Sequence, residues 1–206
     1  MKKALIGSGG FAREIKHQMN CDLIFFVDDS YWVEGDSNLL PLSDFNPSEY
    51  EVLVAIGNPL DRYNVVNRLP KETKYFSFIH PSAIILDDNI EIGEGSIVCA
   101  GSILTTNIKI GKHAHVNLQT TIGHDSIIGD FFTTAPGVKI SGNCKIGNKV
   151  YVGTNASIRE KILICDDVTI GLGSGVIKNI LESGTYVGCP VKKLNKNESK
   201  CNNSLL

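Results

Sequence analysis

Residues 122–147 read IGHDSIIGDFFTTAPGVKISGNCKIG, and aliphatic side chains recur through this stretch every six positions. The same period extends outward on both sides, from Ile92 to Val176, and fourteen of its fifteen positions are aliphatic. Helices repeat near 3.6 residues and strands near 2, so neither alone gives a strict period of six. A six-residue repeat is the signature of a parallel β-helix, which is the fold we predict. The one polar position in the series is Thr134.

The repeat also predicts how each coil is built. Three six-residue sides complete a triangular turn of eighteen residues, and the aliphatic residue of each side points inward. Small or β-branched residues dominate four positions after the inward residue, and glycine often follows it directly. We expect the glycines and small residues to let the chain turn each corner. Fifteen such sides give five coils, above the roughly three repeats that a solenoid needs for stability.

The N-terminal part of the chain lacks this repeat and predicts a small α/β domain with a parallel sheet. Each of three short apolar strands is followed by glycine or aspartate, and ligands bind beyond the carboxyl ends of such strands. The expected strands are 3–6, 23–27 and 52–56, and the expected helices are 11–19 and 61–69.

These patterns divide the chain into three parts. We expect a small α/β domain over residues 1–77 and a β-helix over residues 78–194. The polar residues 195–206 are expected to form a mobile tail.

Composition sets limits on partners and location. The chain is 42% hydrophobic with a net charge of -2, which indicates neither a polyanion-binding surface nor an acidic tail, so no nucleic-acid partner is expected. The N-terminus lacks the long apolar run of a signal peptide, and no run approaches the roughly 18 residues of a membrane span. The six cysteines have no metal-type spacing and are expected to be reduced. We therefore expect a cytoplasmic protein without membrane insertion.

Four motifs give the chain a family resemblance. Its Ile-Gly pairs, six residues or a multiple apart, resemble those of the hexapeptide-repeat acyltransferases, which are left-handed β-helix trimers that mostly use acetyl-CoA. With GSGGFA at 7–12, FVDD at 26–29, AIGN at 55–58 and IGHD at 122–125, it is similar to the nucleotide-sugar N-acetyltransferases of bacterial glycan synthesis. That family includes the enzymes that acetylate UDP-linked 4-amino sugars in the bacillosamine pathway, and a sister group O-acetylates sialic acid.

The resemblance implies a fold, an assembly and an activity. The expected fold is a Rossmann-like α/β domain joined to a left-handed parallel β-helix, assembled as a homotrimer. The expected reaction transfers acetyl from acetyl-CoA to the amine of a nucleotide-linked, UDP-linked 4-amino sugar. Two alternatives stay open, namely O-acetylation of a sugar hydroxyl, as in the sialic acid group, and a non-catalytic trimeric scaffold that binds a nucleotide.

Three residues are candidates for the chemistry. His124 stands two positions after inward Ile122 and should point outward, and imidazole can accept a proton at neutral pH. The resemblance makes His124 the general base, with adjacent Asp125, often glutamate in the family, holding its tautomer. Gly142 follows His124 by eighteen residues and should stack on it. The resemblance implies that the Gly142 N–H donates a hydrogen bond to the thioester oxyanion. The alternative is that Gly142 is only a corner glycine.

The resemblance also assigns binding residues. Phe11 stands where relatives often carry histidine, and Thr133 stands where they often carry a second histidine that contacts acetyl-CoA. A threonine can donate a hydrogen bond there but cannot relay a proton. Asn117 is assigned to the acceptor sugar, with a structural asparagine ladder as an equal alternative. The nucleotide is assigned to Gly9, Gly10, Phe11, Asp28, Asp29 and Gly57, and acetyl-CoA to Thr133, Gly142, Thr154 and Leu172.

The sequence also bears on two other cofactors, zinc and NAD. His113, His115 and His124 raise a zinc site of the kind found in hexapeptide-repeat carbonic anhydrases, but their spacing does not match that group, so no metal is predicted. The loop at 7–12 lacks a full Gly-x-Gly-x-x-Gly, which argues against NAD. That loop follows a strand and opens a helix, so it fits a phosphate-binding turn or a plain tight βα turn.

Overall fold

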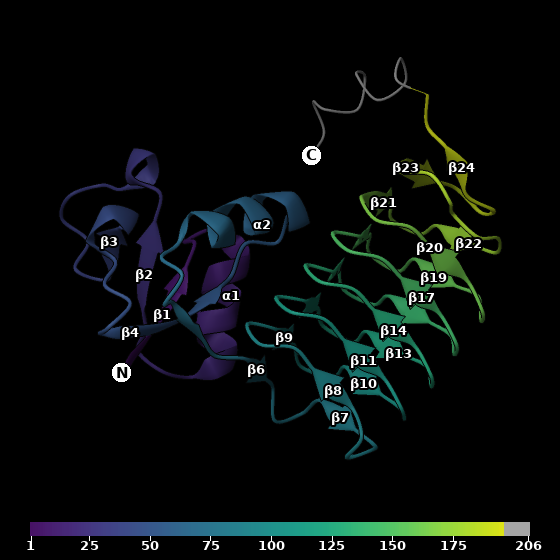
Figure 1. The fold of residues 1–206 in the computed structure, drawn as a ribbon, viewed down its shortest axis with the longest axis horizontal. Helices are drawn as coiled ribbons and strands as arrows, with labels where there is room; N and C mark the ends of the chain where they lie inside the picture. The colour runs from purple at the N-terminus through teal and green to yellow at the C-terminus, as the bar shows by residue number, and fades with distance from the viewer. Residues whose placement is uncertain (196–206) are drawn as a thin grey trace.

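The computed structural model describes residues 1–195 of the chain. A small α/β unit lies beside a triangular β-helix, and the coils of the β-helix stack in order from β6 to β24 (Figure 1). The predicted mobile tail, apart from Asn195, lies outside the described residues. Within them no helix is long and apolar enough to cross a membrane.

The α/β unit is a five-stranded parallel sheet in the order β3-β2-β1-β4-β5. The three predicted strands and two predicted helices are confirmed to within two residues, while β3 and β5 at the two edges were not predicted. The elements are β1 (Lys2–Ile6), α1 (Gly10–Met19), β2 (Ile24–Val27), η1 (Asp29–Tyr31), β3 (Leu39–Pro41), η2 (Leu42–Asp44), β4 (Tyr50–Val54), α2 (Pro59–Arg68) and β5 (Lys74–Tyr75).

One helix covers each side of this sheet. On the side of α1, Ile15 packs with Leu5 and Leu53 of the sheet and with Ile97 and Cys99 of the β-helix, so one apolar cluster joins the two parts of the chain. On the other side, the α2 residues pack against the central strands. That cluster comprises Ala4, Ile6, Phe26, Phe45, Val52, Val54, Val65 and Leu69.

The β-helix has three faces of short strands. Face 1 is β6 (Phe78–Ile79), β9 (Ile97–Val98), β12 (His115–Val116), β15 (Thr133–Thr134), β18 (Tyr151–Val152), β21 (Val168–Ile170) and β23 (Gly184–Val187), closed by antiparallel β24 (Lys192–Lys193). Face 2 is β7 (Ile84–Ile85), β10 (Ile103–Leu104), β13 (Thr121–Ile122), β16 (Lys139–Ile140), β19 (Ser157–Ile158) and β22 (Gly175–Val176). Face 3 is β8 (Glu91–Ile92), β11 (Lys109–Ile110), β14 (Ile127–Ile128), β17 (Lys145–Ile146) and β20 (Leu163–Ile164).

The six-residue repeat fixes the register of these faces. Ile110 pairs with Ile128 and Ile128 with Ile146, so each coil advances by eighteen residues as predicted. Every position of the inward series from Val98 to Val176 is buried. Thr134 is among them, and its hydroxyl contacts Thr120 Oγ1 at 2.9 Å inside the core. The predicted inward row is therefore confirmed, including its one polar position.

The glycines after the inward residues have a different role from the one predicted. A Cβ on Gly123 would lie 2.5 Å from the backbone nitrogen of Gly142, so glycine is required there because successive coils stack closely. The chain turns at the third residue after each inward position from Ile92 to Ile170, and that residue has a left-handed backbone. Those residues are Gly95, Gly101, Asn107, His113, Gln119, Asp125, Phe131, Gly137, Asn143, Lys149, Asn155, Lys161, Asp167 and Gly173.

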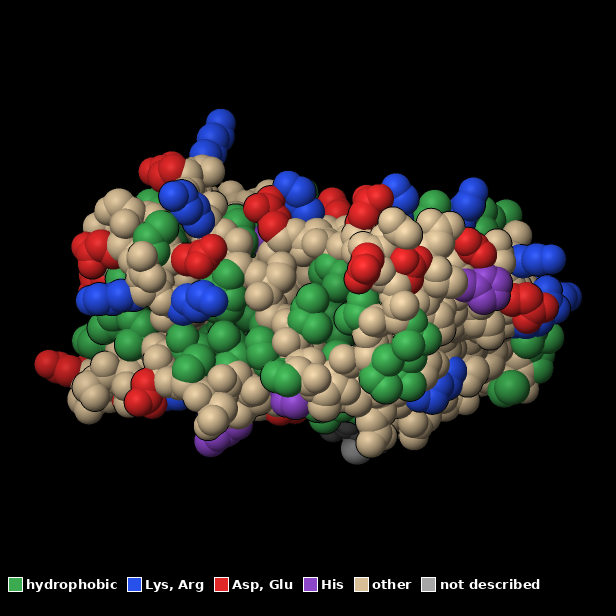
Figure 2. Space-filling model, turned by 90° about the horizontal axis from the view of Figure 1, so that it is seen from below, with side chains coloured by type: hydrophobic (Ala, Val, Ile, Leu, Met, Phe, Trp, Pro, Cys, Tyr) green, Lys and Arg blue, Asp and Glu red, His purple; other side chains and the backbone are tan. Residues whose placement is uncertain are grey.

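The surface of the first coils is apolar. Figure 2 shows hydrophobic side chains gathered in the middle of one face, where the first coils lie beside the α/β unit. Among the residues of the first coils, Ile79, Ile84, Ile85 and Leu86 have exposed apolar side chains. The cysteines among residues 1–195 are free thiols in this structure.

Candidate active site

The His124–Asp125 pair lies at the corner that follows β13. His124 Nδ1 is 2.7 Å from Asp125 Oδ2, and Asn107 of the preceding coil donates to Asp125 Oδ1 at 2.7 Å. The hydrogen bonds from Asn107 and His124 hold the pKa of Asp125 below its usual value. A carboxylate only accepts, so Nδ1 carries the ring proton. Nε2 of the half-exposed imidazole is then left free to accept a proton.

Gly142 lies directly next to this imidazole, one coil further on. A Cβ on Gly142 would lie 2.6 Å from His124 Nε2, so the ring occupies the space that a side chain would fill. The backbone binds the two coils together, since Asn143 N–H donates to the His124 carbonyl at 2.7 Å. No acceptor for the Gly142 N–H is found among the described residues. The predicted stacking is therefore present, with a free N–H donor beside the free ring nitrogen.

Thr133 does not lie at this corner. Its side chain is 4% exposed, and its hydroxyl accepts from Arg62 at 2.8 Å and donates to the Gly57 carbonyl at 3.0 Å. Both partners belong to the α/β unit, so the hydroxyl joins the two parts of the chain. The hydroxyl is buried and paired within this chain, and its predicted contact with acetyl-CoA stays a prediction.

The same interface contains a buried arginine that the sequence did not single out. Arg62 of α2 is fully buried, and burial lowers the pKa of its guanidinium to about 9, which still leaves it charged at neutral pH. It donates to His115 Nδ1 at 3.1 Å, and His115 Nε2 lies 3.1 Å from the Val54 carbonyl. A guanidinium only donates, so Nε2 carries the proton of His115. Burial and the Arg62 charge push the pKa of His115 well below its usual value.

The three histidines weighed as zinc ligands are not brought together. His113 stacks on Phe131 with ring centroids 5.1 Å apart, and Tyr75 meets it edge-on at 4.6 Å. Burial and the Arg62 charge lower the pKa of His113 to about 4. His115 is buried under Arg62, and His124 is exposed at another corner. Among residues 1–195 no group of three or more His, Cys, Asp or Glu could hold a metal ion.

The predicted nucleotide residues gather at the carboxyl edge of the sheet. Gly9 and Gly10 begin α1 after β1, and Gly57 precedes Asn58, whose side chain accepts from the N–H groups of Leu60 and Asp61 at the start of α2. Space for a Cβ is open at all three glycines. Two helix N-termini therefore face one edge, which favours an anion there.

The remaining nucleotide candidates have partners of their own. Phe11 packs against His115 with ring centroids 5.1 Å apart, so it fills the interface rather than offering a polar contact. Asp28 pairs with Arg68 at 2.9 Å, and this hydrogen bond, with that of Ser30, lowers the pKa of Asp28. Asp29 accepts from the Ser43 N–H at 3.1 Å.

The last candidates lie on face 1 or the corner after it. Asn117 accepts from the Leu118 N–H at 2.7 Å through its side chain, a local turn contact that favours its structural interpretation. Thr154 and Leu172 are exposed and stack one coil apart, joined by the bond from Gly173 N–H to the Thr154 carbonyl. They follow β18 and β21, whereas His124 follows β13 of face 2. One chain therefore does not bring them to the His124 corner.

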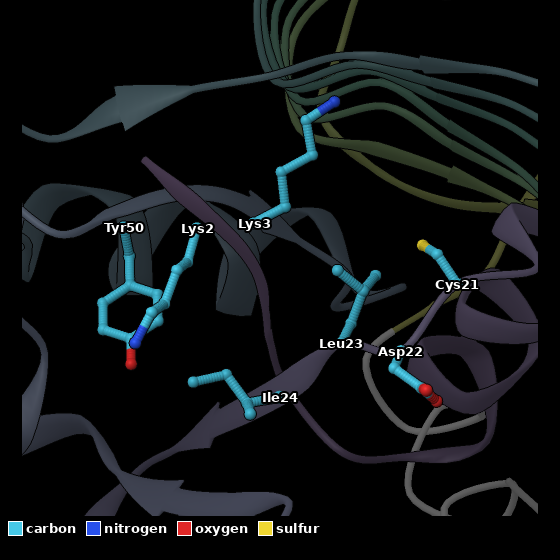
Figure 3. A pocket seen from close by; sticks show the side chains of 7 residues that line it. All are labelled: Lys2, Lys3, Cys21, Asp22, Leu23, Ile24 and Tyr50. Atoms are coloured by element: carbon cyan, nitrogen blue, oxygen red, sulfur yellow. The ribbon is translucent and has the colours of Figure 1, made fainter.

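A separate pocket opens at the opposite, amino-terminal edge of the sheet. It is lined by the first residues of β1 and β4 and by the segment that leads into β2 (Figure 3). None of the predicted site residues lines it. The lining residues are Lys2, Lys3, Cys21, Asp22, Leu23, Ile24 and Tyr50.

Comparison with known proteins bears on both parts of the chain. A family profile described as the PglD N-terminal domain matches residues 2–69. The chain is 31% identical over 174 residues to the GDP-perosamine N-acetyltransferase of Escherichia coli O157:H7, covering 77% of this chain and 78% of that protein. The chain belongs to the nucleotide-sugar N-acetyltransferase family.

Solved structures of similar proteins agree with this family. WeeI from Acinetobacter baumannii AYE is 32% identical with a TM-score of 0.84, covering 94% of this chain and 100% of that one. The acetyltransferase domain of PglB from Neisseria gonorrhoeae FA1090, in complex with acetyl coenzyme A, is 28% identical with a TM-score of 0.82, covering 94% and 98%. The predicted family, its acetyltransferase class and acetyl-CoA as cosubstrate of such N-acetyltransferases are confirmed at the level of the family.

Proposed function

We propose that this chain transfers the acetyl group of acetyl-CoA to the amine of a nucleotide-linked amino sugar. The observation that carries the proposal is the His124–Asp125 pair stacked on Gly142, with a free Nε2 and a free N–H side by side. An attacking amine must lose a proton, and an acyl transfer builds negative charge on the thioester oxygen. This corner offers one group for each need.

The proposed steps follow from the positions of these groups. The ammonium of the sugar first loses one proton to solvent water. The free amine then attacks the thioester carbon, and His124 Nε2 takes one of the two protons left on the attacking nitrogen. Asp125 stabilises the resulting imidazolium through Nδ1, and the Gly142 N–H donates to the oxyanion. The C–S bond then breaks, and the proton on Nε2 passes to the leaving thiolate, which restores the neutral ring.

We propose that residues 1–77 hold the nucleotide at the carboxyl edge and that residues 78–194 hold acetyl-CoA. The open Gly9, Gly10 and Gly57 support the first part, because backbone N–H groups at two helix starts suit a diphosphate. A UDP-linked 4-amino sugar is the acceptor we propose. The GDP sugar in the name of the E. coli relative is the first alternative to compare with it.

We also propose that the protein works as a homotrimer. Thr154 and Leu172, which we assign to acetyl-CoA, lie at a different corner of the prism from His124, so a groove between two copies would unite them. Leu172 is 81% exposed, and Ile127 and Leu163 of face 3 are also exposed, which suits a surface that another copy covers. Light scattering should give about three times the 22.4 kDa chain mass, and a monomer at assay concentration would contradict the proposal.

The test of function measures thiol release from acetyl-CoA with a panel of UDP-, dTDP- and GDP-linked amino sugars, with products analysed by mass spectrometry. We expect one acetyl group to be added to an amino sugar by the wild type and not by His124→Ala. Activity only on sialic acid-type hydroxyl acceptors would establish O-acetylation instead. Acetyl-CoA binding without turnover on any acceptor would favour the non-catalytic scaffold.

A further inference from the structure

Arg62 is the one Lys or Arg side chain buried among residues 1–195. Its guanidinium reaches three parts of the chain at once. Towards its own domain, Nη1 donates to the carbonyls of Ile56 and Gly57 in the turn before α2. Towards the β-helix, it donates to groups on two successive coils. These acceptors are the His113 carbonyl at 2.9 Å, His115 Nδ1 at 3.1 Å, the Phe131 carbonyl at 3.0 Å, the Phe132 carbonyl at 3.1 Å and Thr133 Oγ1 at 2.8 Å.

Among residues 1–195 no carboxylate contacts the charged Arg62 guanidinium. All of its contacts within the described chain are carbonyl oxygens, a hydroxyl and a neutral imidazole, and none is a carboxylate. Such acceptors satisfy the donors but leave the net positive charge in place. A buried ion without an oppositely charged partner is strongly unfavourable. A protein therefore retains one only where it needs the charge or the planar fork of N–H donors that a guanidinium provides.

The turn that Arg62 holds is the start of a helix. Gly57 precedes Asn58, the N-cap of α2, and the helix N-terminus already carries a partial positive charge. The guanidinium donates to the Ile56 and Gly57 carbonyls of this turn. Two positive sources therefore act on the same small region of the surface.

We propose that Arg62 is a positioning residue that sets the affinity of the carboxyl edge for the diphosphate of the nucleotide sugar. Its fork fixes the Ile56–Gly57 turn against the β-helix, and its uncompensated charge favours an anion at that turn. This inference rests on the proposed function, in which the nucleotide binds at this edge.

The experiment compares the binding of UDP and GDP with that of the uncharged nucleosides uridine and guanosine, by calorimetry on the full chain. We expect Arg62→Met to weaken diphosphate binding by about tenfold relative to nucleoside binding, because it removes a positive charge behind the turn that faces the diphosphate. Arg62→Lys keeps the charge and loses the fork, so it should lie between wild type and Arg62→Met. Lys2→Met removes one charge at the opposite edge of the same sheet and should leave both affinities unchanged.

Kinetics supply a second readout, because a positioning role at the nucleotide edge should raise the KM for the nucleotide sugar and leave kcat within about threefold. Equal losses for diphosphate and nucleoside, or a fall in kcat with KM unchanged, would overturn the inference. If neither Arg62 variant folds, Thr133→Val removes one acceptor from the same fork and should weaken UDP or GDP binding, and unchanged binding would overturn it. A wild type that binds none of these ligands would instead contradict the proposed function.

Discussion

Gly142→Ala tests whether His124 works from the position it occupies here. The new Cβ would lie 2.6 Å from Nε2, whereas ordinary contact begins at 3.4 Å, so the imidazole must move by about 0.8 Å. A misplacement of about 1 Å costs about 10²-fold in rate. We therefore expect kcat to fall by about 30- to 100-fold, or about 2 to 2.7 kcal/mol of activation free energy. The N–H at position 142 is kept, so the KM for acetyl-CoA should change little.

The assay is steady-state thiol release with the acceptor identified from the panel, accompanied by thermal unfolding. The backbone of Gly142 is not left-handed, so alanine is compatible with the chain and the melting temperature should stay near that of wild type. Ser141→Ala, which changes the neighbouring exposed residue without adding volume, is the matched control and should keep full activity. A Gly142→Ala enzyme with normal melting and a kcat within threefold of wild type would refute the stacked arrangement as the working one.

Three further predictions follow from the site and the interface. His124→Ala should lower kcat by about 10² to 10⁴, the usual loss for a general base, and near-normal turnover would exclude that role. Thr133→Val should lower the free energy of unfolding by about 1 to 3 kcal/mol, because it leaves Arg62 and the Gly57 carbonyl short of a partner, while the KM for acetyl-CoA stays unchanged. The pKa of buried His113 is about 4 in the folded chain, below its ordinary value of 6.5, so stability is present above pH 6.5 and falls as pH drops towards 4. Urea unfolding between pH 7.5 and 4.5 should show this loss, which is about 1.4 kcal/mol of unfolding free energy per pH unit below pH 6.5. His113→Phe should reduce the dependence of the unfolding free energy on pH by that amount. An unaltered slope would count against His113 as its source.

The sequence predicts the β-helix well because its signal is local and periodic. One inward residue in every six gives the register of all three faces, and the eighteen-residue coil places Gly142 next to His124. The edge strands β3 and β5 were missed because they are short and only partly buried, so they lack a distinct apolar run. The period also does not show why the residue after an inward position is glycine. The sequence analysis therefore predicted that these glycines turn the corners, whereas they allow successive coils to stack closely.

The interface was missed for a different reason. Arg62 contacts residues 51 to 71 positions later in the chain, and no local pattern reports such pairings. A signal was nevertheless present, since Arg62 lies three residues after Pro59 and three before Val65, on the buried side of α2. A charged residue in the apolar stripe of a helix indicates a buried polar network. The same network holds the Thr133 hydroxyl between Arg62 and the Gly57 carbonyl.

The contacts of Arg62 on two successive coils have a consequence for how the chain reaches one structure. Coils of nearly identical shape offer the α/β unit many similar places to dock, displaced from one another by one coil. The fork meets a matching set of acceptors at the coils of His115 and Thr133, on either side of His124 in the chain. Docking one coil away would separate Arg62 from the His115 ring and the Thr133 hydroxyl. This arginine therefore selects one coil among several of nearly identical shape, and it fixes the distance between the nucleotide edge and the catalytic corner.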